Sequence, residues 1–540
     1  MEIIKKAIEF HKKGDLAQAE EYYKLYLTRN PNEAKAHHLL GAMYIQKGEL
    51  NLAKDSLEKA FTLENSLPIE TDLALCYYKL EDYSKAFEHL KAVIEKDKNK
   101  ALLETILKCA KKINKADECL QYLIESQDDK SNDIAKLREI AGLAFDCEEF
   151  DIAEEYYKKV IQICPDDFIA YNNLGLAYEY ANDFDKAETA YKKAIEIKPN
   201  LDPYYNLSIL LKRKRKYKEA LDALLETKKF KSTDFKKFNH ALGTLRLTQR
   251  DFSGYAPYMD YIRRKYTKDM ELWWQGGTDE NATLVVCATE GYGDIIMFSR
   301  YLDFIDASKF KEVIIIVPKE LLELYTYNFP TFKVLEMGTC DSIPYNAGTI
   351  LMELPLIYNL DFDHIPSSNK YLLTPPEYTE KWHKRLDKTK TSAKMNVGIF
   401  FAGNTEDKRT LRNRKVPFRE LLPLLELENI RYYSLQPEST FKKDFEGQNI
   451  EDLSEEIKSF SDTAAIIDEM DIVISADSAV AHLAGALGKK TYLMLPYSAD
   501  WRWFNDTKTT PWYDSVEIFK QQKEGDWAPV IQEIKQNLKK

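Results

Sequence analysis

Residues 168–199, FIAYNNLGLAYEYANDFDKAETAYKKAIEIKP, contain the complete pattern of a helical hairpin. The predicted first helix carries Gly175 and Tyr178, and the predicted second helix carries Ala187 and Tyr191. Small residues at the crossing of two helices let their backbones approach, while large residues one turn away fill the groove between them. The stretch therefore predicts two helices packed against each other.

The same pattern returns along the first half of the chain every 33 or 34 residues. Its small crossing residue recurs as Ala19, Ala53, Ala86, Ala153, Ala187 and Ala220, with a degenerate unit around Ala116. A helical hairpin with this period is the tetratricopeptide repeat. We therefore predict an all-helical tetratricopeptide superhelix over residues 1–232.

A superhelix of this kind exposes an extended concave surface suited to a protein or peptide partner. Two features of the repeats have a plainer interpretation. Packing between helices is the better explanation of the paired tyrosines Tyr22, Tyr23, Tyr156 and Tyr157. The basic run KRKRK at 212–216 is typical of a solvated turn and is weak evidence for a ligand.

Composition narrows the class of protein. A formal net charge of −11 argues against non-specific electrostatic binding of nucleic acid, because such binding needs an excess of cationic side chains. The seven cysteines form no closely spaced pairs, which favours reduced thiols in the cytoplasm. No apolar run approaches the roughly 20 residues of a membrane helix, and the N-terminus lacks the apolar core of a signal peptide. We therefore expect a cytoplasmic protein without a transmembrane segment.

The hydrophobic pattern changes after a helical connector at residues 233–275. Short β-branched runs then alternate with helical segments, at 283–287, 313–317, 397–401, 432–435, 472–475 and 491–495. Apolar strands separated by helices indicate parallel sheets that are buried on both faces. Pro375-Pro376 and a lysine-rich stretch separate two predicted Rossmann-like domains, residues 276–390 and 391–540.

Polar residues follow several of these strands, at the edge where parallel sheets bind ligands. After the first strand, Glu290, Gly291 and Gly293 precede Asp294 at the start of a predicted helix. The two glycines allow close backbone approach, and a capping role for Asp294 is the alternative to a catalytic one.

A basic loop follows the strand at 397–401. It begins with Gly403 and Asn404 and continues with the run KRTLRNRK at 408–415. Arginines bind phosphate groups in a bidentate manner, so this loop suits a nucleotide, although a solvated basic loop has the same composition.

A third polar group ends the strand at 472–475. Asp477 and Ser478 precede a helix of small residues, whose free amides suit an anion. His482 lies four residues after Ser478 and therefore shares its helix face.

Together with Ser434-Leu435-Gln436, 462–464 and 500–503, these segments resemble bacterial tetratricopeptide-linked glycosyltransferases. Residues 235–540 are similar to the heptosyltransferase family, which has the two-domain GT-B fold. The resemblance implies a catalytic base at Asp294, with Glu290, Gly291 and Gly293 on the acceptor side. For the nucleotide-sugar donor it implies a binding set of Gly403, Asn404, Arg409, Arg414, Gln436, Asp477, Ser478 and His482.

The sequence departs from this family in two places. Relatives commonly have Glu-Gln-Gly before the Gly-Asp pair, where this chain has Thr289-Glu290-Gly291. The basic loop is also reordered, so the choice of phosphate ligand among Lys408, Arg409, Arg412 and Arg414 stays open.

The resemblance predicts an inverting, metal-independent O-glycosyltransferase that modifies Ser or Thr of a protein recruited by the repeats. Some proteins of this architecture modify flagellin with nonulosonic acids, which favours flagellin as the acceptor and a CMP-linked donor over a UDP-linked one. No further cofactor is expected. The alternatives are an enzyme of the O-GlcNAc transferase type with a UDP-sugar, and a non-catalytic scaffold.

Two further motifs bear on this function. Trp501 and Trp503 are candidates for stacking on a base or shaping the acceptor channel, although such residues more often pin the C-terminal segment in place. Asp361-Phe362-Asp363 has the form of a metal-binding Asp-x-Asp, but it lies before a proline-containing loop and not after a clear strand. We therefore predict no metal site.

Overall fold

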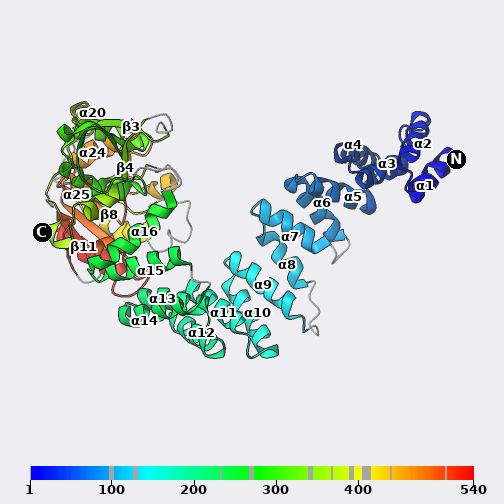
Figure 1. Cartoon of the computed structure of the whole chain (residues 1–540), viewed down its shortest axis with the longest axis horizontal. Helices are drawn as coiled ribbons and strands as arrows, with labels where there is room; N and C mark the ends of the chain where they lie inside the picture. Colours follow the sequence, from blue (N-terminus) through cyan, green and yellow to red (C-terminus); the bar gives the residue numbers. More distant parts are fainter. Residues whose placement is uncertain are drawn as a thin grey trace. The chain divides into compact units, whose positions relative to one another are not determined.

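We describe the protein from a computed structural model, which covers residues 2–96, 102–125, 132–231, 234–266, 273–338, 344–366, 369–387, 395–403, 415–437, 441–504 and 507–540. Backbone contacts divide the chain into two compact units, Met1–Asn206 and Leu207–Lys540. Figure 1 shows helices throughout the first unit and sheets with helices in the second. Among the described residues, no helix is long and apolar enough to cross a membrane.

The first unit is a row of helical hairpins (Figure 1). Each hairpin packs its two helices together, and its second helix contacts the first helix of the next hairpin in α2–α3, α4–α5, α6–α7 and α10–α11. The helices are α1 (Glu2–Lys13), α2 (Leu16–Arg29), α3 (Ala34–Lys47), α4 (Leu50–Leu63), α5 (Leu67–Lys79), α6 (Tyr83–Lys96), α7 (Leu103–Lys112), α8 (Asp117–Glu125), α9 (Ile134–Asp146), α10 (Phe150–Ile163), α11 (Phe168–Tyr180) and α12 (Phe184–Ile197).

The hairpin of α11 and α12 confirms the reason for the repeat pattern. A Cβ atom on Gly175 would lie 2.6 Å from ring atoms of Tyr191, so only glycine fits this crossing. Ala187 is fully buried. Asp183 caps α12 by accepting a hydrogen bond from the backbone N–H of Lys186, which satisfies one of the unpaired amides at the helix start.

Four more helices lead into the second unit. They are α13 (Leu201–Arg213), α14 (Tyr217–Glu226), α15 (Phe235–Thr248) and α16 (Tyr255–Tyr266), with the 3₁₀ turns η2 (Thr227–Lys229) and η3 (Phe252–Gly254). From Leu207 onward these helices belong by their contacts to the same compact unit as the sheets. That boundary lies before residue 232, where we expected the superhelix to end.

A four-stranded sheet follows in the order β3-β2-β1-β4, and all its strands are parallel. The strands are β1 (Asp279–Cys287), β2 (Phe310–Val317), β3 (Lys333–Glu336) and β4 (Ala347–Ile350). The accompanying helices are α17 (Tyr292–Phe298), η4 (Ser299–Phe304), η5 (Ala307–Lys309), η6 (Lys319–Leu321), α18 (Leu322–Asn328), η8 (Leu351–Glu353), α19 (Leu354–Ile357), η9 (Phe362–His364) and α20 (Pro376–Asp387).

The second sheet has seven strands in the order β10-β11-β9-β8-β5-β6-β7, parallel except for the β10–β11 pair. The strands are β5 (Met395–Phe400), β6 (Ile430–Ser434), β7 (Glu451–Asp452), β8 (Ile472–Ala476), β9 (Thr491–Leu495), β10 (Thr509–Thr510) and β11 (Tyr513–Lys520). The helices are α22 (Phe418–Leu425), α23 (Lys442–Phe445), α24 (Phe460–Asp468), α25 (Ala479–Ala486), η11 (Trp501–Trp503) and α26 (Ala528–Leu538).

One buried apolar core joins the two sheets. It contains Leu284 and Val286 of β1, Leu493 of β9, and Trp501 and Trp503 of η11. Helix α17, which follows β1, packs on α25, which follows β8. The segments that follow β1 and β8 are therefore neighbours, and the candidate site lies where they meet.

Candidate functional site

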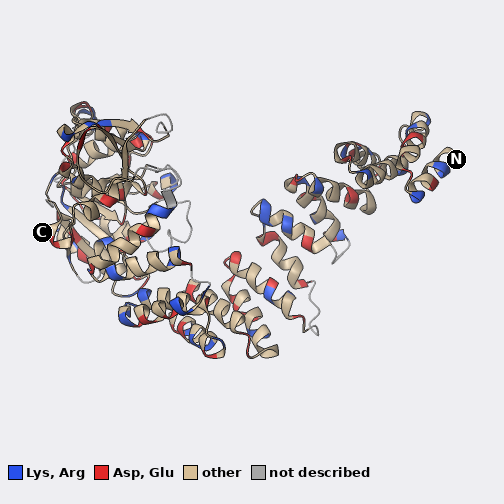
Figure 2. Ribbon diagram, viewed as in Figure 1, with Lys and Arg blue, Asp and Glu red and all other residues tan. Residues whose placement is uncertain are grey.

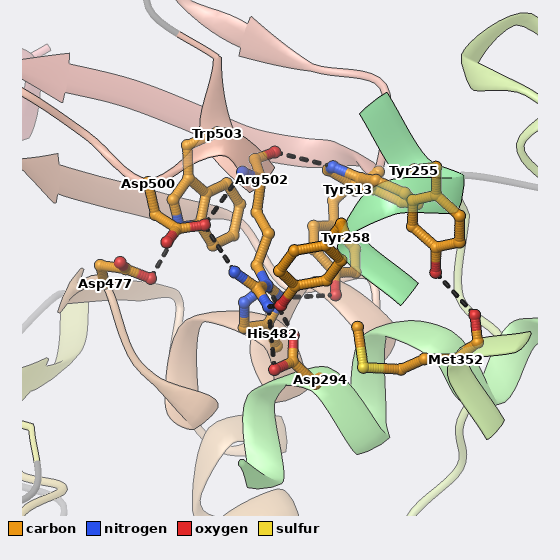
Figure 3. A network of polar contacts seen from close by, with 11 residues as sticks. Tyr255, Tyr258, Asp294, Met352, Asp477, His482, Asp500, Arg502, Trp503 and Tyr513 are labelled. Carbon is orange, nitrogen blue, oxygen red and sulfur yellow. Dashed lines mark hydrogen bonds and ion pairs between the residues drawn. The ribbon is translucent and has the colours of Figure 1, made fainter. Parts of the chain in front are cut away.

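Asp294 lies in the first turn of α17, directly after β1, and its carboxylate is held by Arg502 of η11 (Figure 3). Arg502 donates from Nε to Oδ1 at 2.5 Å and from Nη2 to Oδ2 at 3.0 Å. This is the two-point geometry in which guanidinium and carboxylate groups interact most strongly. The N-cap position of α17 is Gly291, so Asp294 is an ion-pair partner and not the helix cap.

Arg502 has further acceptors around its guanidinium. Nη1 donates to Oδ1 of Asp500 at 2.6 Å, and Nη2 donates to the hydroxyl of Tyr258 on α16 at 3.1 Å. The guanidinium also lies 4.7 Å from the ring centroid of Trp501, within cation–π range. Arg502 therefore links α16, α17 and η11 through one side chain.

The ion pair is largely buried, with 14% of the Asp294 side chain and 12% of the Arg502 side chain exposed. Burial raises the pKa of the Asp294 carboxyl above its ordinary value, and the Arg502 guanidinium opposes that shift. The pKa of Arg502 is raised by the two carboxylates that face it, against the effect of burial. Asp294 thus has the environment of a tuned acid–base group, with a cation bound to it.

Gly293 of α17 and His482 of α25 are in close contact. A Cβ atom on Gly293 would lie 2.8 Å from Cδ2 of His482, closer than any real side chain is found. Glycine is therefore required here by the close approach of the two helices. The close neighbour of Gly293 in this structure is a histidine of the helix that follows β8.

His482 and Asp477 are buried and have partners inside the protein (Figure 3). The Nδ1 atom of His482 lies 2.9 Å from the Tyr513 hydroxyl, and its ring stacks on Trp503 at a centroid distance of 4.6 Å. Asp477 accepts a hydrogen bond of 2.7 Å from Nε1 of Trp503. Asp477 and His482 therefore share one aromatic partner, and both help to fix η11 in place.

Ser478 is the N-cap of α25. Its hydroxyl accepts a hydrogen bond from the backbone N–H of Ala481 at 3.3 Å and lies 3.0 Å from the hydroxyl of Ser475. Capping explains its position at the helix start.

Gln436 is buried and clamps the end of β5. Its side-chain oxygen accepts from the backbone N–H groups of Phe401 and Ala402, and its amide donates back to the Ala402 carbonyl. This holds the first turn after the strand, where Gly403 is partly exposed. The remainder of the predicted donor loop, with Asn404, Lys408, Arg409, Arg412 and Arg414, lies outside the described residues.

The predicted acceptor-side residues lie beside Asp294. Glu290 has a left-handed backbone conformation, with φ at 78°, and lies within electrostatic reach of Asp294. Gly291 is exposed, and a Cβ atom placed on it would meet nothing within 4 Å. Glu290 therefore contributes charge to the site, whereas close packing does not restrict position 291 to glycine.

The site also includes Lys212, which the sequence placed in a solvated turn, and His240, which the sequence did not indicate. Lys212 on α13 interacts electrostatically with Asp500 and Arg502, and burial lowers the pKa of Lys212 to about 8. His240 on α15 faces Lys212, and its pKa is lowered mainly by burial. The repeat spacing of 33 or 34 residues is the one sequence signal for these helices, and it does not predict that their side chains reach the sheets.

The interpretation of 212–216 as a solvated turn was wrong. Arg213 forms a salt bridge of 2.9 Å with Glu524. Arg215 donates from Nε and Nη2 to the Tyr497 carbonyl at 3.1 and 2.5 Å, and its guanidinium lies 4.0 Å from the Tyr497 ring centroid. The run therefore attaches the end of α13 to the loops that follow β9 and β11 of the second sheet.

The aromatic cluster has structural contacts. Trp501 packs against Tyr258 at a ring distance of 5.6 Å, and Trp512 donates from Nε1 to the Arg502 carbonyl at 2.7 Å. Asp361 caps η9 by accepting from the Asp363 backbone N–H, which gives this acidic pair a local role. Among the described residues, no group of three or more His, Cys, Asp or Glu side chains is placed to hold a metal ion.

The repeats of the first unit define its class. The family model of the tetratricopeptide repeat matches residues 3–33, 34–66 and 133–200. The first unit is therefore built from tetratricopeptide repeats, as the period predicted.

One curated relative resembles part of this chain. Protein FlbA of Caulobacter vibrioides is 27% identical over 291 residues, which cover 48% of this chain and 46% of the relative. The chain thus spans less than half the length of the relative that it matches. This is a distant homologue.

Solved tetratricopeptide structures also match, at low similarity. The C-terminal part of a repeat-containing protein from Cytophaga hutchinsonii is 17% identical, with a TM-score of 0.31, over 44% of this chain and 98% of that one. The TPR2AB domain of yeast Sti1, in a complex with pHSP90, is 17% identical, with a TM-score of 0.24, over 48% of this chain and 97% of that one.

Proposed function

We propose that this protein transfers a sugar from a nucleotide-sugar donor to Ser or Thr of a protein that its repeats recruit. The observation that carries the proposal is the position of Asp294. It is a largely buried carboxylate after the first parallel strand, packed against the helix that follows β8 of the second sheet. Ligands of parallel sheets bind at the carboxyl ends of strands, where a carboxylate with a raised pKa suits proton transfer.

In the proposed reaction, Asp294 takes the proton of the acceptor hydroxyl. The hydroxyl oxygen attacks the anomeric carbon of the donor sugar from the side opposite the nucleotide. The bond from that carbon to the phosphate oxygen breaks, and its electron pair leaves with the phosphate. Transfer with inversion follows from this single displacement, and no metal takes part.

The tetratricopeptide repeats support the recruitment of a protein acceptor, because such solenoids commonly bind proteins. Flagellin as that acceptor, and a CMP-linked nonulosonic acid as the donor, are favoured by the resemblance to flagellin-modifying enzymes of this architecture. A UDP-sugar is the alternative donor. We place the reaction in the cytoplasm.

The experiment has two arms. A thermal-shift screen with CMP, UDP, ADP and GDP identifies the nucleotide, and a transfer assay with flagellin and the matching nucleotide sugar is read by intact-protein mass. The mass of one sugar per modified site is expected, and EDTA should leave transfer unchanged. Asp294→Asn should reduce transfer by about 10²–10⁴-fold while nucleotide binding persists. Unchanged transfer by Asp294→Asn would remove the proposed role of this residue.

A non-catalytic scaffold is the second candidate, and one observation favours it. Asp294, Asp477 and His482 each have an internal partner, in Arg502, Trp503 and Tyr513. Fold stability therefore gives these polar groups a structural reason to be present without catalysis. If no nucleotide shifts the melting temperature while flagellin still binds the protein, the scaffold is correct.

A further inference from the structure

Arg502 lies next to Asp294, and a second cationic side chain, Lys212, lies within electrostatic reach of Arg502. The two cations differ in the hydrogen bonds that they make. Arg502 is bonded to Asp294, Asp500 and Tyr258. Lys212 interacts electrostatically with Asp500 and Arg502, but no hydrogen bond joins its amine to another residue in the described part of the chain. The Lys212 amine can therefore donate further hydrogen bonds, whereas the guanidinium of Arg502 already donates to Asp294, Asp500 and Tyr258.

The ion pair between Arg502 and Asp294, as the structure shows it, opposes the proposed role of Asp294 as a base. A carboxylate bound at two points by a guanidinium is a weaker base than a released one, because the cation stabilises its ionised form. Release of Asp294 would leave the Nε and Nη2 donors of Arg502 without their carboxylate acceptor in a largely buried site, although Asp500 would still pair with Nη1, and unpaired buried donors are costly. Arg502 therefore needs a replacement acceptor at the moment that Asp294 takes a proton.

We propose that Arg502 and Lys212 form a subsite for an oxyanion of the substrate, which Asp294 occupies until it is protonated. This inference rests on the proposed glycosyl transfer and assigns a ligand chemistry to its site. The ligand is a phosphate of the nucleotide or a carboxylate of an acidic sugar, since both present the oxygen pairs that a guanidinium binds.

In the reaction, the acceptor hydroxyl gives its proton to Asp294, whose carboxyl becomes neutral. Arg502 then exchanges that carboxyl for the oxyanion. If the oxyanion is the leaving phosphate, the electron pair of the broken bond to carbon arrives there as Arg502 becomes available. The same proton transfer thus produces the nucleophile and frees the cation that stabilises the leaving group.

The charges around the subsite support this coupling. Asp294 interacts electrostatically with Arg502, Asp500 and Glu290, and Lys212 interacts with Asp500 and Arg502. In the described part of the chain, His240, Tyr258 and Tyr255 also interact with members of this cluster. The five charged groups therefore carry one net negative charge, and a proton on Asp294 removes it. Anion binding and protonation of Asp294 favour each other, so the full-length protein should take up a proton when an anion binds.

The test is isothermal titration of the full-length protein with inorganic phosphate at pH 6.5, in two buffers of different ionisation enthalpy. Wild type should take up a fraction of a proton and bind phosphate more weakly at pH 8. Asp294→Asn carries a permanently neutral side chain, so it should bind phosphate several-fold more tightly and lose most of the uptake. A purely structural ion pair predicts no gain in affinity from that substitution.

Matched variants separate the groups. Asp500→Asn also removes an acid from Arg502, so it should tighten binding but keep the proton uptake. Lys212→Met and Arg502→Met should weaken binding, whereas the exposed Asp303→Asn should change nothing. Equal affinity and equal uptake in wild type and Asp294→Asn would overturn the proposal. If Asp294→Asn does not fold, absence of proton uptake by wild type overturns it, and uptake with tighter binding by Asp500→Asn supports it.

Two comparisons identify the ligand and keep this proposal apart from the transfer activity. Competition with phosphate by CMP assigns the subsite to a phosphate, and competition by a free nonulosonic acid assigns it to a carboxylate. Proton-coupled phosphate binding without glycosyl transfer would refute the proposed function and leave the subsite standing. Glycosyl transfer without proton-coupled phosphate binding would refute the subsite and leave the proposed function standing.

Discussion

Gly293 and His482 lie in helices that follow strands of different sheets, and they are in direct contact at a distance that no side chain on residue 293 could allow. This contact brings the helix that carries Asp294 against the helix that carries His482. The geometry of the candidate site depends on it as much as on the polar residues themselves.

Gly293→Ala should therefore disturb the site. The added methyl would lie 2.8 Å from His482, so α17 and α25 must separate, and overpacking of this kind typically costs about 1–3 kcal/mol. We expect a lower melting temperature and weaker nucleotide binding, measured by thermal shift and calorimetry. Gly291→Ala is the matched control, because a methyl there meets nothing within 4 Å. Equal behaviour of the two variants would contradict the close-contact interpretation.

Tyr513→Phe should loosen His482 without creating a large cavity. The substitution removes only the hydroxyl that lies 2.9 Å from Nδ1, and an unpaired buried polar group costs about 1–3 kcal/mol. We expect a lower melting temperature and a change in the NMR chemical shifts of the His482 ring protons. Tyr301→Phe, at another buried tyrosine of the same core, is the control. A Tyr513→Phe protein as stable as wild type would show that this contact contributes little.

Arg215→Ala should weaken the attachment of α13 to the second sheet. It removes two hydrogen bonds to the Tyr497 carbonyl and the stacking on the Tyr497 ring. We expect about 1–3 kcal/mol less stability within this unit, because hydrogen bonds from charged groups contribute at that level. Faster proteolysis near residues 213–217 is the readout. Lys218→Ala, at an exposed neighbour, should leave the cleavage rate unchanged.

Lys212 should give the protein a distinctive pH dependence. Its pKa is about 8 in the folded protein, below the ordinary value of 10.5. Between these two values the unfolded chain binds more protons, so this residue makes the folded state more stable as pH rises from 8 to 10.5. Lys212→Met should flatten that slope, measured as melting temperatures from pH 7 to 10. An unchanged slope would mean that another group causes it.

Periodic features were predicted well from the sequence. The hairpins of the first unit and the strands β1, β2, β5, β6, β8 and β9 all fall where hydrophobic periodicity placed them. The short strands β3, β4, β7 and β10 and the later β11 were missed, because few residues or weak alternation leave no clear pattern. Candidate residues at strand ends were located for the same reason, since Asp294 and Asp477 follow β1 and β8 directly.

The partners of those residues were decided by tertiary structure alone. Arg502 reaches Asp294 across 208 positions of sequence, and Arg215 reaches Tyr497 across 282. Helix and strand periods are local, because they follow from the geometry of neighbouring residues along one backbone. Ion pairs between distant segments follow from how whole elements pack, and a single sequence carries no period for that. The chain itself determined which elements form and which polar groups stand at their ends, and only the folded core determined that Asp294 is held by a cation.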